Sequence, residues 1–211
     1  MRGGHAVLLL GLMLWAEPAA ALKLKVHALT VAIHPQVNPS LTQNEIEQIL
    51  QLASGLLHAS RCGAGFSLKS LTSFTSAPAV INDAADLEAV HSVPADVKVV
   101  QEVNFCIRGA ENGLIGCSWR PNDRPRTMIV TTRVHGFGLD RILWAHEFGH
   151  VAGLAHRSDD RRALMTPCGL DAFNLRINRD ECRHFVAGPA QHFPPGLGPA
   201  CPGIASRHRI N

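Results

Sequence analysis

The sequence predicts a layered α/β domain built on a mostly parallel, five-stranded sheet with one antiparallel edge strand, two long helices and a short C-terminal helix. Three observations favour this class. Short runs rich in valine and isoleucine recur along the first two thirds of the chain, an amphipathic helical pattern lies between the first two of them, and a second helical pattern follows the last. Strands and helices in this order are typical of a sheet covered by helices.

Composition and charge exclude several classes of protein. Hydrophobic residues make up 46% of the 211-residue chain and charged residues 18%, which is too apolar for a disordered chain. Lysine and arginine number 20 against 17 acidic residues, and no run of five or more like charges occurs. We therefore expect no nucleic-acid partner. No internal repeat or interdomain linker is visible, which indicates one domain.

The first 21 residues are typical of a secretory signal peptide. Arg2 precedes an apolar stretch over residues 6–15, and three alanines at 19–21 offer the small residues of a cleavage site. Glu17 and Pro18 make the segment too short for a transmembrane helix of about 20 apolar residues, although an uncleaved anchor is the alternative. We expect the mature chain, 22–211, to be secreted or periplasmic, without stable membrane insertion. In such an oxidising compartment the six cysteines favour disulfides.

The first two elements have clear starting and stopping signals. A nearly continuous apolar run predicts a strand from residue 22 to 33, which Pro35 terminates. Thr42 and Glu45 then have the spacing of a capping box at the start of a helix. The apolar positions of that helix form one stripe for the core: Ile46, Ile49, Leu50, Ala53, Leu56 and Leu57.

The later elements are shorter. Residues 76–94 are ambiguous, with one helical turn expected after Asp83, and Asn112-Gly113 predicts a turn between antiparallel strands. Asn178 and Glu181 predict a second capping box at the start of a short last helix. We expect strands at 66–68, 96–106, 114–119 and 127–134, a helix at 140–152, and an irregular tail rich in proline and glycine from about 188.

The stretch HEFGHVAGLAH, which begins at His146, carries the clearest chemical signal. His146 and His150 are four residues apart, so one face of a helix presents two imidazoles to a single ion, and Glu147 can reach a water molecule on that ion. Gly153 can adopt the left-handed conformation that ends a helix, which returns His156 as a third ligand. Three protein ligands leave the fourth tetrahedral position open, as in catalytic zinc sites. The full spacing arises by chance on the order of 10⁻⁴ times in such a chain.

The longer stretch HEFGHVAGLAHRSDDRRALMTP resembles the metzincin zinc endopeptidases, most closely the matrixin branch. The similarity lies in the phenylalanine after the glutamate and in the short spacing from His156 to Met165. The resemblance implies one catalytic zinc ion held by His146, His150 and His156. It also implies that Glu147 is the general base and that Met165 packs beneath the metal.

The resemblance extends to fold and substrate. The order of the expected elements is similar to that of the upper subdomain of the family, which implies a metzincin-like zincin domain. In that family the antiparallel edge strand, here 114–119, pairs with an extended peptide, although a plain core hairpin is the alternative for this segment. We therefore expect a monomer that binds a peptide or protein substrate in extended form, with side-chain selection by residues from about 168 to 177.

Two departures from the family limit what can be carried over. Thr166 stands where matrixins usually have a tyrosine, and the chain contains no tyrosine at all, so a tyrosine ligand or oxyanion donor is excluded. The glycine- and aspartate-rich segment that holds a second zinc ion and calcium ions in the family is not recognisable, and we assign neither ion.

The cysteines favour a disulfide framework over a metal site, because the CxxC spacings of zinc sites are missing. Cys106 and Cys117 flank the predicted turn and form the best-defined pair. Arg61-Cys62-Gly63 resembles the cysteine-switch triplet, but it follows the first helix of the domain, which favours a structural disulfide. Six cysteines allow 15 connectivities, and the remaining expectation is Cys168 with Cys182 and Cys62 with Cys201.

Two other functions compete with the endopeptidase. A secreted binding module would retain zinc for stability alone, but it would have no use for Glu147 next to an open coordination position. A thermolysin-like enzyme would take a glutamate on a later helix as its third ligand, which His156 makes unnecessary.

Overall fold

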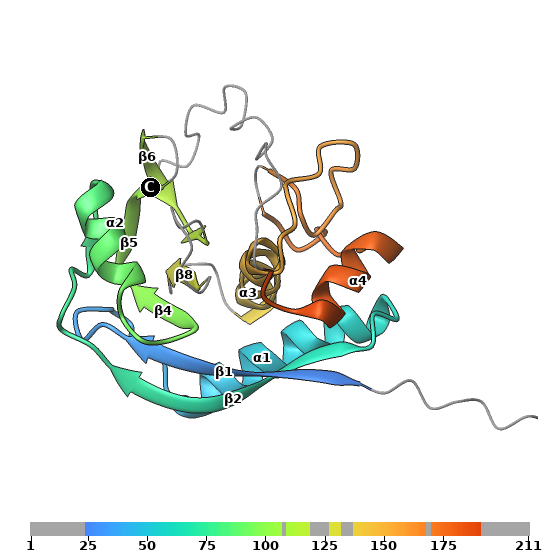
Figure 1. Cartoon of the computed structure of the whole chain (residues 1–211), viewed down its shortest axis with the longest axis horizontal. Helices are drawn as coiled ribbons and strands as arrows, with labels where there is room; N and C mark the ends of the chain where they lie inside the picture. Colours follow the sequence, from blue (N-terminus) through green and yellow to red (C-terminus); the bar gives the residue numbers. More distant parts are fainter. Residues whose placement is uncertain (1–23, 107–108, 119–126, 132–136, 168–169, 191–211) are drawn as a thin grey trace, which may run out of the picture.

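The computed structural model describes residues 24–106, 109–118, 127–131, 137–167 and 170–190. The predicted signal peptide and most of the predicted tail lie outside these residues. Within them, the chain forms two sheets and four helices (Figure 1). Their bounds are β1 Lys25–Ile33, α1 Gln43–Ala59, β2 Ala64–Ser73, β3 Val80–Ile81, α2 Ala84–His91, β4 Val97–Val100, β5 Glu102–Cys106, β6 Gly109–Leu114, β7 Gly116–Cys117, β8 Met128–Thr131, α3 Phe137–Val151 and α4 Arg179–Ala187.

The larger sheet has the strand order β2-β1-β4-β8-β7. β1 runs parallel to β2 and β4, and β4 runs parallel to β8, whereas β7 pairs antiparallel with β8 at the edge. The mostly parallel five-stranded sheet with one antiparallel edge strand is therefore confirmed. The two long helices and the short C-terminal helix are also confirmed as α1, α3 and α4.

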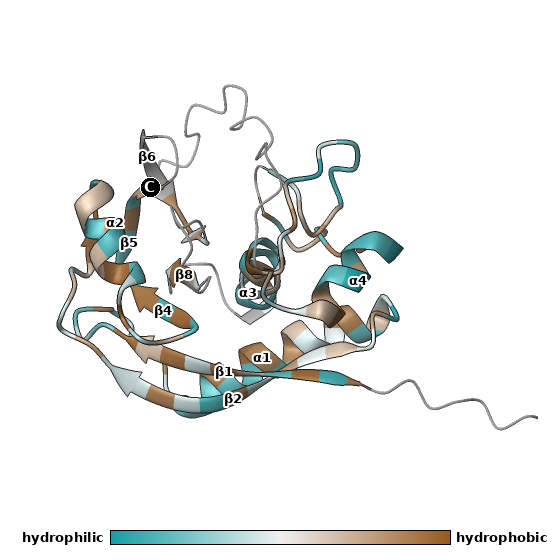
Figure 2. Ribbon diagram, viewed as in Figure 1, coloured by the Kyte–Doolittle hydropathy of each residue, from teal (hydrophilic) through white to brown (hydrophobic). Residues whose placement is uncertain are grey.

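α1 begins as the sequence predicts. The Thr42 hydroxyl accepts the backbone N–H of Glu45, and the Glu45 carboxylate accepts the backbone N–H of Thr42 at 2.7 Å, which completes the capping box. All six residues of the predicted apolar stripe are buried. α1 and α3 pack in one hydrophobic core with alternate residues of β1, β4 and β8, so these two helices cover one face of the sheet. Figure 2 shows β4 as mostly hydrophobic, in keeping with its burial on both faces.

A second sheet and α2 cover part of the other face. β5 lies between β3, which is parallel to it, and β6, which is antiparallel. Val103 of β5 and Leu87 of α2 belong to a second hydrophobic core that includes Ala32 and Ile129 of the larger sheet. Asp83 is the N-cap of α2, and its carboxylate accepts the N–H of Asp86 at 2.9 Å. The single turn expected after Asp83 is thus a helix of eight residues.

The prediction of one strand over 96–106 is wrong. The chain changes sheets at Gln101, where the N–H groups of Gln101 and Glu102 both bond to the carbonyl of Ala79. β4 ends before that point in the larger sheet, and β5 begins after it in the smaller one. Valine occurs on both sides of Gln101, so the sequence does not indicate the change of sheet.

The predicted turn at Asn112-Gly113 is also wrong, because both residues lie within β6. The strand expected at 114–119 is divided between the end of β6 and the two-residue strand β7. Residues 119 and 132–134, at the ends of two predicted strands, lie outside the described part of the chain.

Two disulfides join different elements of the fold. Cys106 of β5 is bonded to Cys117 of β7, as expected. Cys62 is bonded to Cys182 of α4, so the expected pairs Cys168–Cys182 and Cys62–Cys201 are wrong. The two partners lie 120 residues apart, and no local spacing signals the pair. Cys168 and Cys201 are outside the described residues.

The two bridges should differ in their effect on stability. They close separations of 120 and 11 residues, for which the chain-entropy model gives about 5 and about 3 kcal/mol respectively. We expect the Cys62→Ala/Cys182→Ala variant to lose more free energy of unfolding in urea than the Cys106→Ala/Cys117→Ala variant. Equal losses, or a larger loss for the second variant, would contradict the entropic explanation.

Both disulfides are compatible with an extracytoplasmic protein. Among the described residues, none of the helices has the length and apolar character needed to cross a bilayer.

Candidate metal centre

α3 carries two of the three predicted ligands on one face. His146 and His150 are one helical turn apart, both are buried, and their Nε2 atoms lie 3.1 Å from each other. The helix ends one residue after His150, as the sequence predicts from Gly153. Gly153 has a φ of +90°, a conformation that glycine adopts without strain.

The turn at Gly153 brings the third histidine back to the helix. The N–H of Gly153 bonds to the carbonyl of His150, and the N–H of Leu154 bonds to the carbonyl of Gly149, which closes the end of α3. Two residues later, His156 places its Nε2 atom 3.1 Å from Nε2 of His150. The ligand atoms of His146, His150 and His156 all lie within 4.8 Å of one another, so this group could hold a metal ion.

Two backbone carbonyls orient the ligand rings. Nδ1 of His146 lies 2.7 Å from the carbonyl oxygen of Leu164, and Nδ1 of His150 lies 2.8 Å from that of Leu154. A carbonyl oxygen only accepts hydrogen bonds, so each Nδ1 donates its proton outward. Each Nε2 atom then presents an unshared electron pair to the centre. Because two such pairs face each other without a proton between them, the arrangement favours a cation at this point.

Burial keeps the histidines unprotonated. It lowers the pKa of His146 to about 4, to which repulsion from His156 contributes. The pKa of His150 lies well below its ordinary value for the same two reasons, burial first and its neighbours second. Burial also lowers the pKa of His156. At neutral pH the three rings are therefore neutral, which is the form that binds metals.

Met165 packs against α3 between two of the histidines. It is fully buried, and its sulfur contacts the Cα side of Gly149, where a β-carbon would collide with it. Gly149 lies between the two ligands of α3, and Phe185 of α4 packs against the same point. The carbonyl of Leu164, next to Met165, is the acceptor for His146. The segment around Met165 thus supports one ligand directly.

Glu147 faces the edge strand. It is buried, and its Oε2 atom accepts a hydrogen bond of 2.5 Å from the Ser118 hydroxyl. Its Oε1 atom contacts Gly116 of β7. Burial raises the pKa of Glu147 to about 7, while the Ser118 hydrogen bond opposes the rise. A carboxylate with a pKa in this range can both accept and release a proton near neutral pH.

α4 anchors the chain next to His156. The N–H of Arg157 bonds to the carbonyl of Met165 at 2.7 Å, and the Nε atom of Arg157 lies 3.3 Å from the Glu181 carboxylate. Glu181 is also the capping-box residue of α4, where it accepts the N–H of Asn178 at 2.7 Å. The predicted capping box at Asn178 is therefore confirmed, and it positions a carboxylate for Arg157.

The structure brings His146, His150 and His156 together through the turn at Gly153, with Met165 packed against α3 at Gly149 and Glu147 next to His146 in the helix. It adds Gly116, Ser118 and the carbonyl of Leu164, which carry no recognisable sequence signal because they reach the helix from other parts of the chain, and the carbonyl of Leu154 just after the helix. Of the segment 168–177, expected to select side chains, residues 170–177 are described, and Phe173 in it is 71% exposed.

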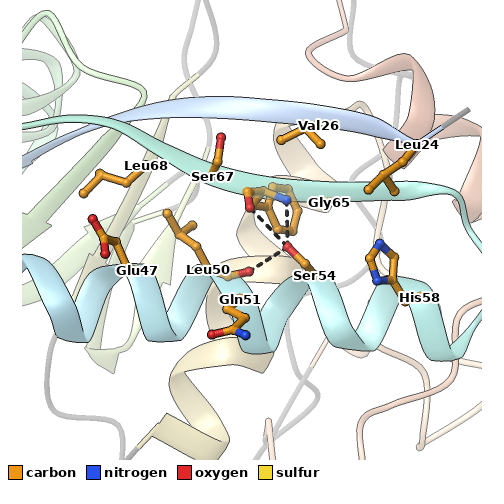
Figure 3. A pocket seen from close by; sticks show the side chains of 11 residues that line it. Leu24, Val26, Glu47, Leu50, Gln51, Ser54, His58, Gly65, Ser67 and Leu68 are labelled. Atoms are coloured by element: carbon orange, nitrogen blue, oxygen red, sulfur yellow. Dashed lines mark hydrogen bonds between the residues drawn. The ribbon is translucent and has the colours of Figure 1, made fainter.

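A pocket of about 420 Å³ lies elsewhere, between α1, the edge strand β2 and its neighbour β1 (Figure 3). Leu24, Val26, Leu50 and Leu68 line it together with polar residues such as Ser54. None of the three histidines, nor Glu147, contributes to its lining. This pocket is therefore separate from the candidate metal centre.

Comparison with known proteins does not assign this chain to a family. No protein-family model and no curated protein matches the sequence. One similar solved structure is described as a chaperone–substrate complex, with 12% sequence identity and a TM-score of 0.48. The alignment covers 78% of this chain and 34% of that one, so this chain spans about a third of the length of that protein. A likeness of this degree supports neither a fold family nor a function.

Proposed function

We propose that this protein is a secreted, zinc-dependent endopeptidase of the matrixin type. The observation that carries the proposal is the convergence of the Nε2 atoms of three histidines, with the buried carboxylate of Glu147 on the residue next to His146 in α3. Three neutral imidazoles without a fourth protein ligand form the donor set of catalytic zinc sites.

Two of the three distances between the Nε2 atoms suit zinc. Zinc–nitrogen bonds of about 2.0–2.1 Å at a tetrahedral angle separate two ligand atoms by about 3.3 Å. The Nε2 atoms of His146 and His156 each lie 3.1 Å from Nε2 of His150, close to this value. Imidazole ligands also suit copper, iron and nickel, so the identity of the metal belongs to the proposal.

His146, His150 and His156 would hold the metal, and Glu147 would handle the proton. A bound zinc ion supplies Lewis-acid chemistry: it lowers the pKa of water and polarises a peptide carbonyl. Glu147 accepts the proton of the attacking water and then donates it to the departing amine. No tyrosine is present to stabilise the oxyanion.

The edge strand offers a place for the substrate. β7 is the last strand of its sheet and pairs on one side with β8. An extended peptide can add to an unpaired sheet edge through backbone hydrogen bonds. Because Gly116 and Ser118 contact Glu147, a peptide bound along this edge would pass close to the base.

Metal analysis together with a cleavage assay tests the proposal. We expect the purified mature protein to contain one zinc ion per chain and to cleave an unfolded protein, with loss of cleavage in the presence of a chelator and recovery on addition of Zn²⁺. A zinc-loaded protein that cleaves no unfolded protein would favour the binding module. A protein that binds no zinc would contradict both the endopeptidase and the zinc-stabilised binding module.

The buried ligands should retain zinc in mildly acidic solution. Protons compete with metals for imidazole, and three ordinary histidines would lose about 10²- to 10³-fold in affinity between pH 7 and pH 5.5. With the pKa of His146 lowered to about 4 and that of His150 well below its usual value, we expect less than about a tenfold loss over this interval. Affinity should fall steeply only as the pH approaches 4. Competition with a chelator at each pH measures the affinity for Zn²⁺. A 10²-fold loss of affinity by pH 5.5 would contradict the prediction.

A further inference from the structure

The short segment Gly116–Cys117–Ser118 contacts Glu147 from the neighbouring sheet. Successive residues of an extended chain point to opposite faces, so residues 116 and 118 share one face and residue 117 takes the other. The contacts follow this pattern. Gly116 and Ser118 both touch Glu147, whereas Cys117 is bonded to Cys106 of β5.

Both carboxylate oxygens of Glu147 are constrained by this segment. The Ser118 hydroxyl donates to Oε2 at 2.5 Å, and both side chains are buried. On the other side, a β-carbon at Gly116 would collide with Oε1, Cδ and Cγ of Glu147. The absence of a side chain at 116 therefore leaves the space that the carboxylate occupies.

We propose that Gly116 and Ser118 are positioning residues for Glu147, and that they fix its carboxylate where it can take a proton from the attacking water. This inference rests on the proposed function. Ser118 holds one oxygen in place by a hydrogen bond, and Gly116 allows the other to approach the edge strand. Neither residue belongs to the metal ligands or to the hydrophobic cores.

The contacts at Gly116 make a selective test possible. The atoms that would collide belong to the flexible end of the Glu147 side chain, so in Gly116→Ala we expect this side chain to move by about 1 Å while the backbone stays in place. Misplacement of a reacting group by about 1 Å can lower a rate about 10²-fold. Gly116→Ala should thus change catalysis and leave the metal and the fold intact.

The experiment compares Gly116→Ala and Ser118→Ala with two matched controls in the zinc-loaded protein. Gly55→Ala adds a methyl group on α1 where nothing lies within 4 Å. Ser54→Ala removes a hydroxyl that bonds to the backbone of Leu50 and Phe66. We expect kcat to fall about 10- to 100-fold in both test variants, with KM and Zn²⁺ affinity unchanged within about threefold, and to stay near the parent value in both controls.

A double-mutant cycle separates positioning from a general structural effect. Glu147→Asp shortens the side chain by one methylene and removes its reach to Ser118. If Ser118 acts through Glu147, Ser118→Ala should lower kcat less than about twofold in the Glu147→Asp background. A crystal structure of zinc-loaded Gly116→Ala should show a displaced Glu147 carboxylate.

The outcomes are distinct. A zinc-loaded parent without peptidase activity would overturn the proposed function and this inference with it. An active parent whose Gly116→Ala and Ser118→Ala variants keep its kcat would overturn the inference alone. An equal fall in kcat on Ser118→Ala in the parent and in the Glu147→Asp background would also overturn the inference.

Discussion

Glu147→Gln should bind zinc as tightly as the parent protein and yet lose about 10²- to 10⁴-fold in kcat. Glutamine keeps the shape of the side chain, and its amide oxygen can still accept the Ser118 hydroxyl, which bonds to Oε2 of Glu147 in the parent. It cannot take up a proton. Because Glu147 lies beside the ligand group without belonging to it, the loss should appear in turnover and not in metal content.

Zinc content, melting temperature and peptide cleavage of parent and variant measure this separation. Glu45→Gln is a suitable control, since it makes the same chemical change at the exposed capping box of α1. A Glu147→Gln variant with most of the parent's peptidase activity would rule out the general-base mechanism. A variant that lost its zinc would show instead that Glu147 supports the metal.

His156→Ala should lose the metal itself. Removal of this side chain leaves two protein ligands on α3, too few for a stable zinc site. We expect a loss in Zn²⁺ affinity of more than about 100-fold, beyond what the removal of an outer-shell partner costs. Peptidase activity should disappear at zinc concentrations that saturate the parent.

Chelator competition measures the affinity, and His58→Ala is the matched control because His58 lies on α1, outside the ligand group. An unchanged affinity in His156→Ala would exclude His156 as a ligand. It would leave the two histidines of α3 as the only candidates in this stretch.

The ligand group was accessible to sequence reasoning because its geometry is local. Four residues make slightly more than one helical turn, so the spacing of His146 and His150 fixes their common face. Gly153 then accounts for the return of His156 within six residues. The capping boxes of α1 and α4 are local in the same sense, since each is completed within three residues.

The remaining features depend on contacts between distant parts of the chain. Ser118 reaches Glu147 across 29 residues, and the local pattern around Ser118 does not indicate this contact. The change of sheet at Gln101 interrupts a run of valines that suits either sheet equally well. The Cys62–Cys182 bridge depends on where α4 docks, which the local pattern around neither cysteine determines.

The backbone acceptors of the ligand histidines bear on how this centre can vary in evolution. His146 and His150 donate to the carbonyls of Leu164 and Leu154, so no side-chain replacement at either position deletes an acceptor. The orientation of the two rings therefore depends on the conformation of the main chain and not on the side chains at 154 and 164. Related sequences can therefore change the side chains at 154 and 164 and keep the acceptors of both rings, provided that they keep a residue such as Gly153 that lets the chain turn. Such replacements would lower the sequence identity at these two positions and leave the orientation of the histidines unchanged.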